Sequence, residues 1–195
     1  MKQPGPSPII AKDAAAHARA LGEVHADEVH EFYGPFTMVE GLIEFVRVAS
    51  PGYGEMDMAY LLGRKPPTVY VNSAAGERFL GTRFPKVERY RLADDSFSIN
   101  DFDRGHAIAA ELESDRGPLR QAALVVRAHP QTEYVAERYS ADNVWGGLFD
   151  CHGIDMRLAA RARGMIRWAE GRVETVDRSA TLFRGSYGRI TPRRS

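Results

Sequence analysis

Hydrophobic and polar residues alternate along much of the chain beyond Gly34. The clearest case runs from Ile154 to Trp168, where every second residue is apolar or small and the residues between them are mostly Arg or Asp. A period of two over so many residues predicts a long strand with one face in water, and Gly164 is its expected bend. Ala160 and Ala162 lie on the apolar face, where a filled core usually has larger side chains. We therefore expect free space behind this strand.

Short segments rich in β-branched and aromatic residues, separated by Gly, Pro, Asn or Asp, predict further strands. The expected strands are 36–49, 55–62, 68–72, 78–84, 87–92, 97–100, 106–113, 119–128, 153–169 and 172–190. Because no helix separates them, a parallel α/β sheet is excluded, and an antiparallel sandwich or closed barrel is favoured. A long strand that bends at glycine and turns directly into another long strand curls a sheet. We predict an all-β fold, an antiparallel lipocalin-like (calycin-type) β-barrel.

The N-terminal part has a different composition. Residues 1–8 contain three prolines and a glycine, which is typical of an extended arm. Residues 11–21 are rich in alanine and predict a helix that ends at Gly22. We expect two parts, an N-terminal arm and helical lid over 1–32 and a β-barrel domain over 33–195, with the lid across one mouth of the barrel or against its outside.

Composition narrows the class of protein. The 195 residues are 44% hydrophobic, and 26 basic side chains balance 26 acidic ones, so the chain is globular and is not a general nucleic-acid binder. No apolar stretch approaches the roughly 20 residues that span a bilayer, and a single cysteine fits the reducing cytoplasm. Ten arginines against four acidic residues after residue 153 predict a basic surface there.

The motifs of several enzyme classes are absent from the sequence. It contains no G-x-G-x-x-G, no Walker loop and no G-x-S-x-G elbow. No two of the six histidines have the spacing of a metal-binding pair, so we expect neither a cofactor nor a metal. Cys151 and His152 are neighbours on an extended segment and point to opposite faces, which favours a structural cysteine over a nucleophile.

Aromatic residues with a polar group recur at strand positions. Such rings give a cavity apolar walls with a few hydrogen-bond donors. The alternative is that they only fill the core. The candidate ligand-binding residues are Tyr60, Tyr70, Trp145, Trp168 and Tyr187.

Two further residues are candidates for catalysis. His106 begins an otherwise apolar row with Ile108 and Leu112, where a neutral imidazole could orient a ligand carbonyl, although a core histidine is the alternative. Glu40 shares a predicted strand face with Met38, and a carboxylate in an apolar cavity has a raised pKa and can act as a general acid or base.

The C-terminal half also resembles a known family. The segments FSINDF, HAIAAELES, LRQAALVVRA, VWGGLFD, ARARGMIRW and FRGSYGRI resemble, in their order, the lipocalin-like barrels of hydroxyneurosporene synthase-type proteins and of bacterial natural-product cyclases. The chain is long enough for one of the two barrel halves of the former, and no catalytic residue is carried over. The resemblance implies a site inside the barrel that folds a flexible hydrophobic substrate toward a near-attack conformation.

These observations predict that the protein binds a hydrophobic small-molecule intermediate in the barrel and catalyses its cyclisation or isomerisation in a biosynthetic pathway. The alternative is a non-catalytic carrier or sequestering protein that uses the same cavity. A third hypothesis is an interaction module with a filled barrel, whose Arg-rich face meets an acidic partner. We expect no nucleic-acid or membrane partner, and a homodimer is left open.

Overall fold

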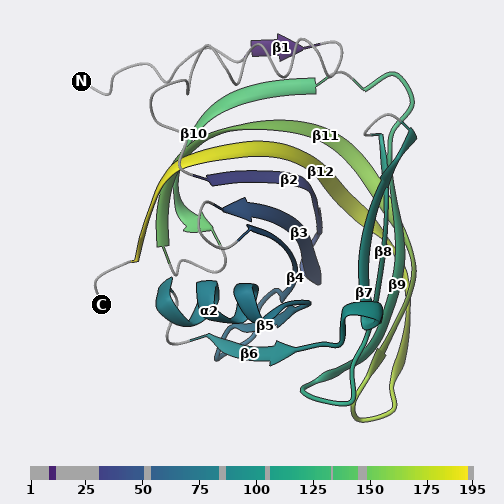
Figure 1. The fold of residues 1–195 in the computed structure, drawn as a ribbon. Coiled ribbons are helices and arrows are strands. Elements are labelled where there is room, and N and C mark those ends of the chain that lie inside the picture. Colours follow the sequence, from purple (N-terminus) through teal and green to yellow (C-terminus); the bar gives the residue numbers. More distant parts are fainter. Residues whose placement is uncertain are drawn as a thin grey trace.

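The computed structural model describes residues 9–11, 31–50, 54–83, 87–103, 106–132, 134–144 and 149–192. Within these ranges, twelve strands belong to one sheet, accompanied by a helix, α2 (Ala74–Arg83), and a short 3₁₀ helix, η1 (Asp94–Ser96) (Figure 1). The strands are β1 (Ile9–Ala11), β2 (Glu31–Val39), β3 (Ile43–Ser50), β4 (Gly54–Leu61), β5 (Thr68–Val71), β6 (Glu88–Arg91), β7 (Phe97–Phe102), β8 (Ala107–Glu113), β9 (Leu119–Ala128), β10 (Tyr134–Val144), β11 (Phe149–Trp168) and β12 (Val173–Pro192).

The sheet is a curled half-barrel. Its main path runs β6-β5-β4-β3-β2-β12-β11-β9-β8-β7, and β10 pairs with β11 and β1 outside this path. Figure 1 shows the long strands β11 and β12 arching across the sheet and descending beside β8 and β9, with β6 and α2 at the opposite side. The predicted all-β, barrel-like fold is confirmed. It differs from a fully antiparallel closed barrel because β5 and β6 are parallel, and because β6 and β7 end the path without pairing.

The interior of the described part is packed. The sheet curls until β3 and β4 lie close to β7, with the ring centroids of Phe45 and Phe97 6.2 Å apart. Ala160 and Ala162 are 1% and 0% exposed. A water-sized void beside these alanines would expose part of their surface, so no such void adjoins them. The expectation of free space behind β11 is therefore wrong here, because these alanines belong to one buried cluster with larger side chains of other strands, among them Phe45, Tyr70 and Phe97.

Helix α2 covers the outer face of β4 and β5. Phe79 and Leu80 are fully buried, and a Cβ added to Gly76 would meet Val71 at 2.2 Å, so the helix lies directly on the sheet. The predicted strand 78–84 is therefore wrong. The missed signal is a helix start, in which Ser73 Oγ accepts a hydrogen bond from the Gly76 amide at 3.0 Å and an acidic residue lies in the first turn.

Most other strands match their predicted positions, with two exceptions. The expected single strand 36–49 is a hairpin of β2 and β3, in which Gly41 has φ +66° and the Leu42 amide donates to Val39 O at 3.0 Å. The apolar pattern runs through this turn and hides it. Strand β10 was not predicted; it pairs with β11 from Val135 opposite Arg157 to Val144 opposite Phe149.

The predicted helix over 11–21 lies almost entirely outside the described residues. The described part before β2 is β1, which pairs antiparallel with β10. The division at residue 32 and the role of 1–32 as a lid stay predictions. In the described ranges, no helix is both long and apolar enough to cross a membrane.

Candidate functional site

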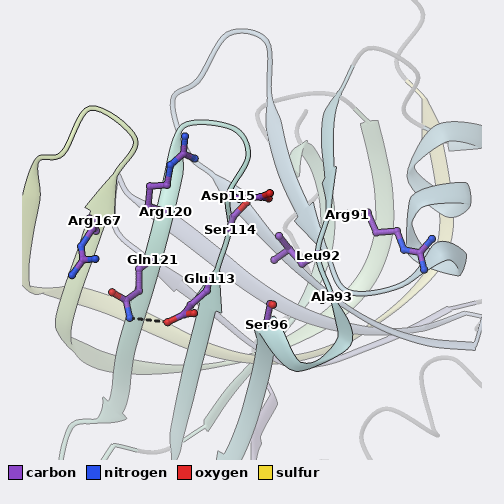
Figure 2. A pocket seen from close by; sticks show the side chains of 10 residues that line it. All are labelled: Arg91, Leu92, Ala93, Ser96, Glu113, Ser114, Asp115, Arg120, Gln121 and Arg167. Atoms are coloured by element: carbon purple, nitrogen blue, oxygen red, sulfur yellow. Dashed lines mark hydrogen bonds between the residues drawn. The ribbon is translucent and has the colours of Figure 1, made fainter.

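A polar hollow of about 580 Å³ opens where the ends of β6, β8, β9 and β11 meet η1 (Figure 2). This volume is in the usual range of small-molecule sites. The lining residues are Arg91, Leu92, Ala93, Ser96, Glu113, Ser114, Asp115, Arg120, Gln121 and Arg167.

Strand register explains why polar side chains gather here. Gln121 of β9 lies opposite Glu113 of β8 and Arg167 of β11, so the three form one row across three strands. Their neighbours Ala122 and Ile166 are buried in the interior, which turns the row to the outer face. Gln121 Nε2 donates to Glu113 Oε1 at 3.2 Å, and this bond fixes two of the three side chains (Figure 2).

Three arginines border the hollow. Figure 2 shows Arg120 rising from the start of β9 with Arg167 to one side, and Arg91 at the opposite edge with its guanidinium group directed away from these two. Arg120 Nη1 donates to Gly117 O at 2.8 Å, a neutral acceptor. Among the residues that the structure describes, none of the three guanidinium groups has a carboxylate partner. A guanidinium group has five N–H donors in a fork that fits carboxylate and phosphate oxygens, so these groups can hold an anion.

The same hollow also contains acceptors. Glu113 and Asp115 supply two carboxylates, and Ser96 supplies a hydroxyl. The hydroxyl of Ser114 is engaged by the turn, since it donates to Arg116 O at 2.9 Å and accepts from the Arg116 amide at 3.0 Å. The lining can therefore hold an anionic group and also accept hydrogen bonds from hydroxyl or amino groups of the same ligand.

Tyr70 faces the interior of the half-barrel, but its polar group is satisfied by the protein. Its hydroxyl oxygen accepts from the Leu119 amide at 2.9 Å and lies 3.2 Å from Arg116 O, which accepts its proton. Its ring stacks on Tyr90, with centroids 5.2 Å apart. Burial raises the pKa of Tyr70 to about 12. The hydrogen bonds of the Tyr70 hydroxyl therefore hold the β8–β9 turn against β5.

Tyr60 lies on the other face of the sheet. The register places it beside Val69, whereas Tyr70 is beside Ala59, so the two tyrosines point in opposite directions. Tyr60 is opposite Glu44, and burial first, then the charge of Glu44, raises the pKa of Tyr60 to about 12. The prediction that Tyr60 and Tyr70 line one pocket is wrong for this reason.

Trp168 occupies the predicted inner row of β11 and is 5% exposed. Its Nε1 donates to Glu174 Oε2 at 3.2 Å, while Arg172 and Arg64 lie over its ring at 4.9 and 5.3 Å from the centroid. Burial raises the pKa of Glu174, but hydrogen bonds from Arg172 and Trp168 and nearby positive charge outweigh it, so that the pKa is lowered. Side chains of the protein itself thus occupy the faces and the polar edge of the indole.

The two predicted catalytic residues both lie at turns. His106 is half-buried just before β8, with Nδ1 3.1 Å from Asp103 O. Glu40 is exposed in the β2–β3 turn, where its amide donates to Ser179 O at 3.1 Å. The expectation that Glu40 points into an apolar cavity is wrong, because the chain reverses at this residue instead of continuing as a strand.

Two predicted residues cannot be placed with the others. Trp145 lies outside the described residues. For Tyr187 the structure describes the backbone, opposite Gly153 in the β11–β12 ladder, and its side chain lies outside the description.

No predicted site residue lines the hollow. The residues that do are arginines and polar groups at strand ends; the polar face of β11 in the basic C-terminal region was the sequence signal for Arg167, and the sequence analysis contained no signal for the others. Within the described ranges, no three His, Cys, Asp or Glu side chains are grouped so that they could hold a metal ion.

Comparison with known proteins gives a coarse result. No protein-family model matches the chain, and no curated protein matches its sequence. A solved structure of acetoacetate decarboxylase matches 85% of this chain and 86% of its own, with 9% sequence identity and a TM-score of 0.38. At this level of similarity no activity is transferred. Hydroxyneurosporene synthase-type proteins and cyclases are not among these findings, so the resemblance is supported only as a barrel-like, mostly β fold.

Proposed function

We propose that the protein binds a small polar molecule with a carboxylate or phosphate group in the hollow of Figure 2. The observation that supports this proposal is that Arg120 and Arg167, neither of which has a described carboxylate partner, border one cavity of ligand size, with Arg91 at its far edge. Glu113 and Asp115 would select ligands that also carry hydroxyl or amino groups. The rigid strands beneath these residues hold them in place before a ligand arrives, which lowers the entropy cost of binding.

Titration calorimetry with citrate and inorganic pyrophosphate tests this proposal, with glucose as an uncharged probe. We expect saturable binding of at least one anion, weakened about tenfold in Arg167→Gln because a charge-assisted hydrogen bond is lost. Arg116→Gln is the matched control, since Arg116 is equally charged, highly exposed and outside the lining. The proposal fails if neither anion gives saturable heat, or if both variants bind as the unchanged protein does.

Catalysis is a second proposal, for a different part of the molecule. Cyclisation or isomerisation of a hydrophobic intermediate would need a cavity inside the barrel, and the described interior is packed. The observation in its favour is that the backbones of β11 and β12 continue beyond the packed part, past Leu158 and Phe183. Binding without turnover in the same cavity would make the protein a carrier.

An uncharged apolar fluorophore, phenylnaphthylamine, tests for such a cavity. We expect one saturable site and weaker binding in Tyr187→Ala than in Tyr90→Phe, a tyrosine substitution remote from that end of the strands. Incubation with a linear hydrophobic precursor then separates turnover from stoichiometric binding. Absence of a saturable site for the fluorophore would end the proposal of a hydrophobic ligand. It would not affect the proposal that the polar hollow binds an anion.

A further inference from the structure

A second hollow, of about 370 Å³, lies on the outer face of β9 and β11. Its lining contains four cationic or titratable basic side chains and no carboxylate. The lining residues are Val125, Arg127, Ala128, His129, Arg161 and Arg163. It shares none of them with the hollow of Figure 2.

Strand register builds this hollow. Arg163 of β11 lies opposite Val125 of β9, and Arg161 lies opposite Arg127, so three guanidinium groups border one exposed valine. Ala162, between the two β11 arginines, is fully buried, which places Arg161 and Arg163 together on the outer face.

Carboxylates outside the lining contact each of these arginines at one edge of its guanidinium group and so orient it. Asp177 Oδ1 contacts Nε of Arg161 at 2.5 Å and Nε of Arg163 at 3.5 Å. Arg127 uses Nη1 to reach Asp103 Oδ2 at 2.8 Å. In Arg161 and Arg163 the two Nη groups have no described acceptor, so each guanidinium has donors left for a further anion. The fixed Nε contacts reduce the side-chain freedom that a ligand would otherwise have to remove.

The floor of the hollow is apolar. Val125 is 43% exposed, which is unusual for a valine in the middle of a strand. The aliphatic stems of the arginines form the walls, since these stems cover apolar surface while the charged ends stay in water. An anion with an apolar body would cover the valine and place its charge among the guanidinium groups.

We propose that this hollow is a binding site for a soluble amphipathic anion, a small molecule with an apolar body and one carboxylate, sulfonate or phosphate group. The apolar part lies on Val125, and the charged group accepts hydrogen bonds from Arg161 and Arg163. The site is independent of the hollow of Figure 2, because the two hollows share no lining residue.

The test uses anilinonaphthalene sulfonate, a fluorescent amphipathic anion, and phenylnaphthylamine, which has the same rings without the sulfonate. We expect saturable binding of the sulfonate with about tenfold lower affinity in Arg161→Gln/Arg163→Gln, which removes the charges and shortens each aliphatic stem by one methylene. Phenylnaphthylamine should show no dependence on the two arginines. Val125→Ser should also weaken sulfonate binding, because it removes the apolar floor.

Two control variants make the outcome specific. Arg116→Gln removes a positive charge outside both hollows and should bind the sulfonate as the unchanged protein does, whereas Arg167→Gln reports whether the dye enters the hollow of Figure 2 instead. Circular dichroism melting of each variant shows that it is folded, since a loosened protein binds this dye nonspecifically. Equal sulfonate affinity in the double variant, or equal weakening in Arg167→Gln, would overturn the proposal. The second result would assign the dye to the hollow of Figure 2 and support that proposal instead.

Discussion

Tyr70 illustrates how a side chain that suits a ligand pocket can serve the fold. A Cβ added to Gly117 would lie 2.5 Å from the Tyr70 hydroxyl and 2.6 Å from the Tyr90 ring, so only glycine lets the β8–β9 turn approach the two tyrosines. The hydroxyl then accepts from the Leu119 amide, which is buried. Sequence alone identifies a tyrosine on a buried strand, but it does not identify this distant partner.

Replacing this hydroxyl gives the first prediction. Tyr70→Phe leaves the Leu119 amide without its acceptor in the interior, and we expect a loss of about 1–3 kcal/mol in the free energy of unfolding. Tyr90→Phe is the control, since the Tyr90 hydroxyl bonds only to the exposed Glu88 and its loss should matter less. Urea denaturation measures both. Equal losses in the two variants would contradict the role assigned to Tyr70.

The raised pKa values of Tyr60 and Tyr70 predict a specific pH dependence. Both are about 12 in the folded protein, against about 10 in an unfolded chain. Because the folded state keeps these protons longer, the stabilisation is complete below pH about 10 and is lost as the pH rises toward 12. The melting temperature should therefore fall as the pH rises from about 10 to about 12, and tyrosinate absorbance should rise over the same interval. Tyrosinate that forms fully near pH 10 without unfolding would contradict the prediction.

At the scale of elements, Gly164 lets two strands meet. It has φ +147°, and an added Cβ would lie 2.0 Å from Ala123 O, so any side chain here would push β11 away from β9. The sequence predicted Gly164 as a bend from its place in the alternating pattern. It did not predict which strand lies against it, because strand pairing is set by the whole sheet.

Two glycine substitutions separate the effect of the close contact with Ala123 from the effect of a positive φ angle. Gly164→Ala should destabilise the protein by several kcal/mol or prevent folding, since the β9–β11 ladder must open. Gly171→Ala also has a positive φ, +87°, but nothing lies within 4 Å of its added Cβ. It should cost only about 1–2 kcal/mol, the dihedral penalty. Similar melting temperatures for the two variants would show that the contact with Ala123 is unimportant.

Local patterns predicted some elements better than others. Strands β8 and β9 alternate buried and exposed residues, and their predicted bounds agree with the structure to within a residue. Residues 74–83 have a weak apolar period and contain two glycines, so the pattern indicated a turn followed by a strand where the structure has α2. The helix packs against β4 and β6 with Phe79 and Leu80 fully buried, and this packing, which stabilises it, is not a local property.

At the scale of the whole molecule, a partly buried ion pair stabilises the seam of the half-barrel, which is the place where the sheet path ends at β6 and β7 with no ladder between them. Arg47 of β3 contacts Asp57 of β4 through Nε at 2.8 Å and Nη2 at 3.0 Å. The same Nη2 donates to Ile99 O of the end strand β7 at 2.9 Å. One side chain thus joins β3 and β4 to β7, an end strand of the sheet path that no ladder joins to the other end strand, β6.

Breaking this pair should loosen the seam. Asp57→Asn leaves the partly buried Arg47 charge with only the exposed Glu55, whose Oε1 lies 3.3 Å from Arg47 Nε, and we expect a loss of about 2 kcal/mol in the free energy of unfolding, below that for a fully buried pair. Hydrogen exchange of β7 amides should rise more than that of β9. Asp177→Asn removes an exposed carboxylate and should leave unfolding nearly unchanged. A loss in Asp57→Asn without faster exchange in β7 would show that the pair stabilises β3 and β4 only.

The sequence by itself determined the class of fold, because alternation with a period of two, punctuated by turn residues, requires strands with one buried face. It also determined which face of β11 is wet and that this face is basic. The tertiary structure decided whether the barrel is hollow, since the filling of its interior depends on how far the sheet curls and which distant strands then meet. It also decided where polar side chains border a cavity, because Gln121 and Arg167 come from neighbouring strands and Arg91 comes from the end strand β6, which only the curl of the sheet brings near them.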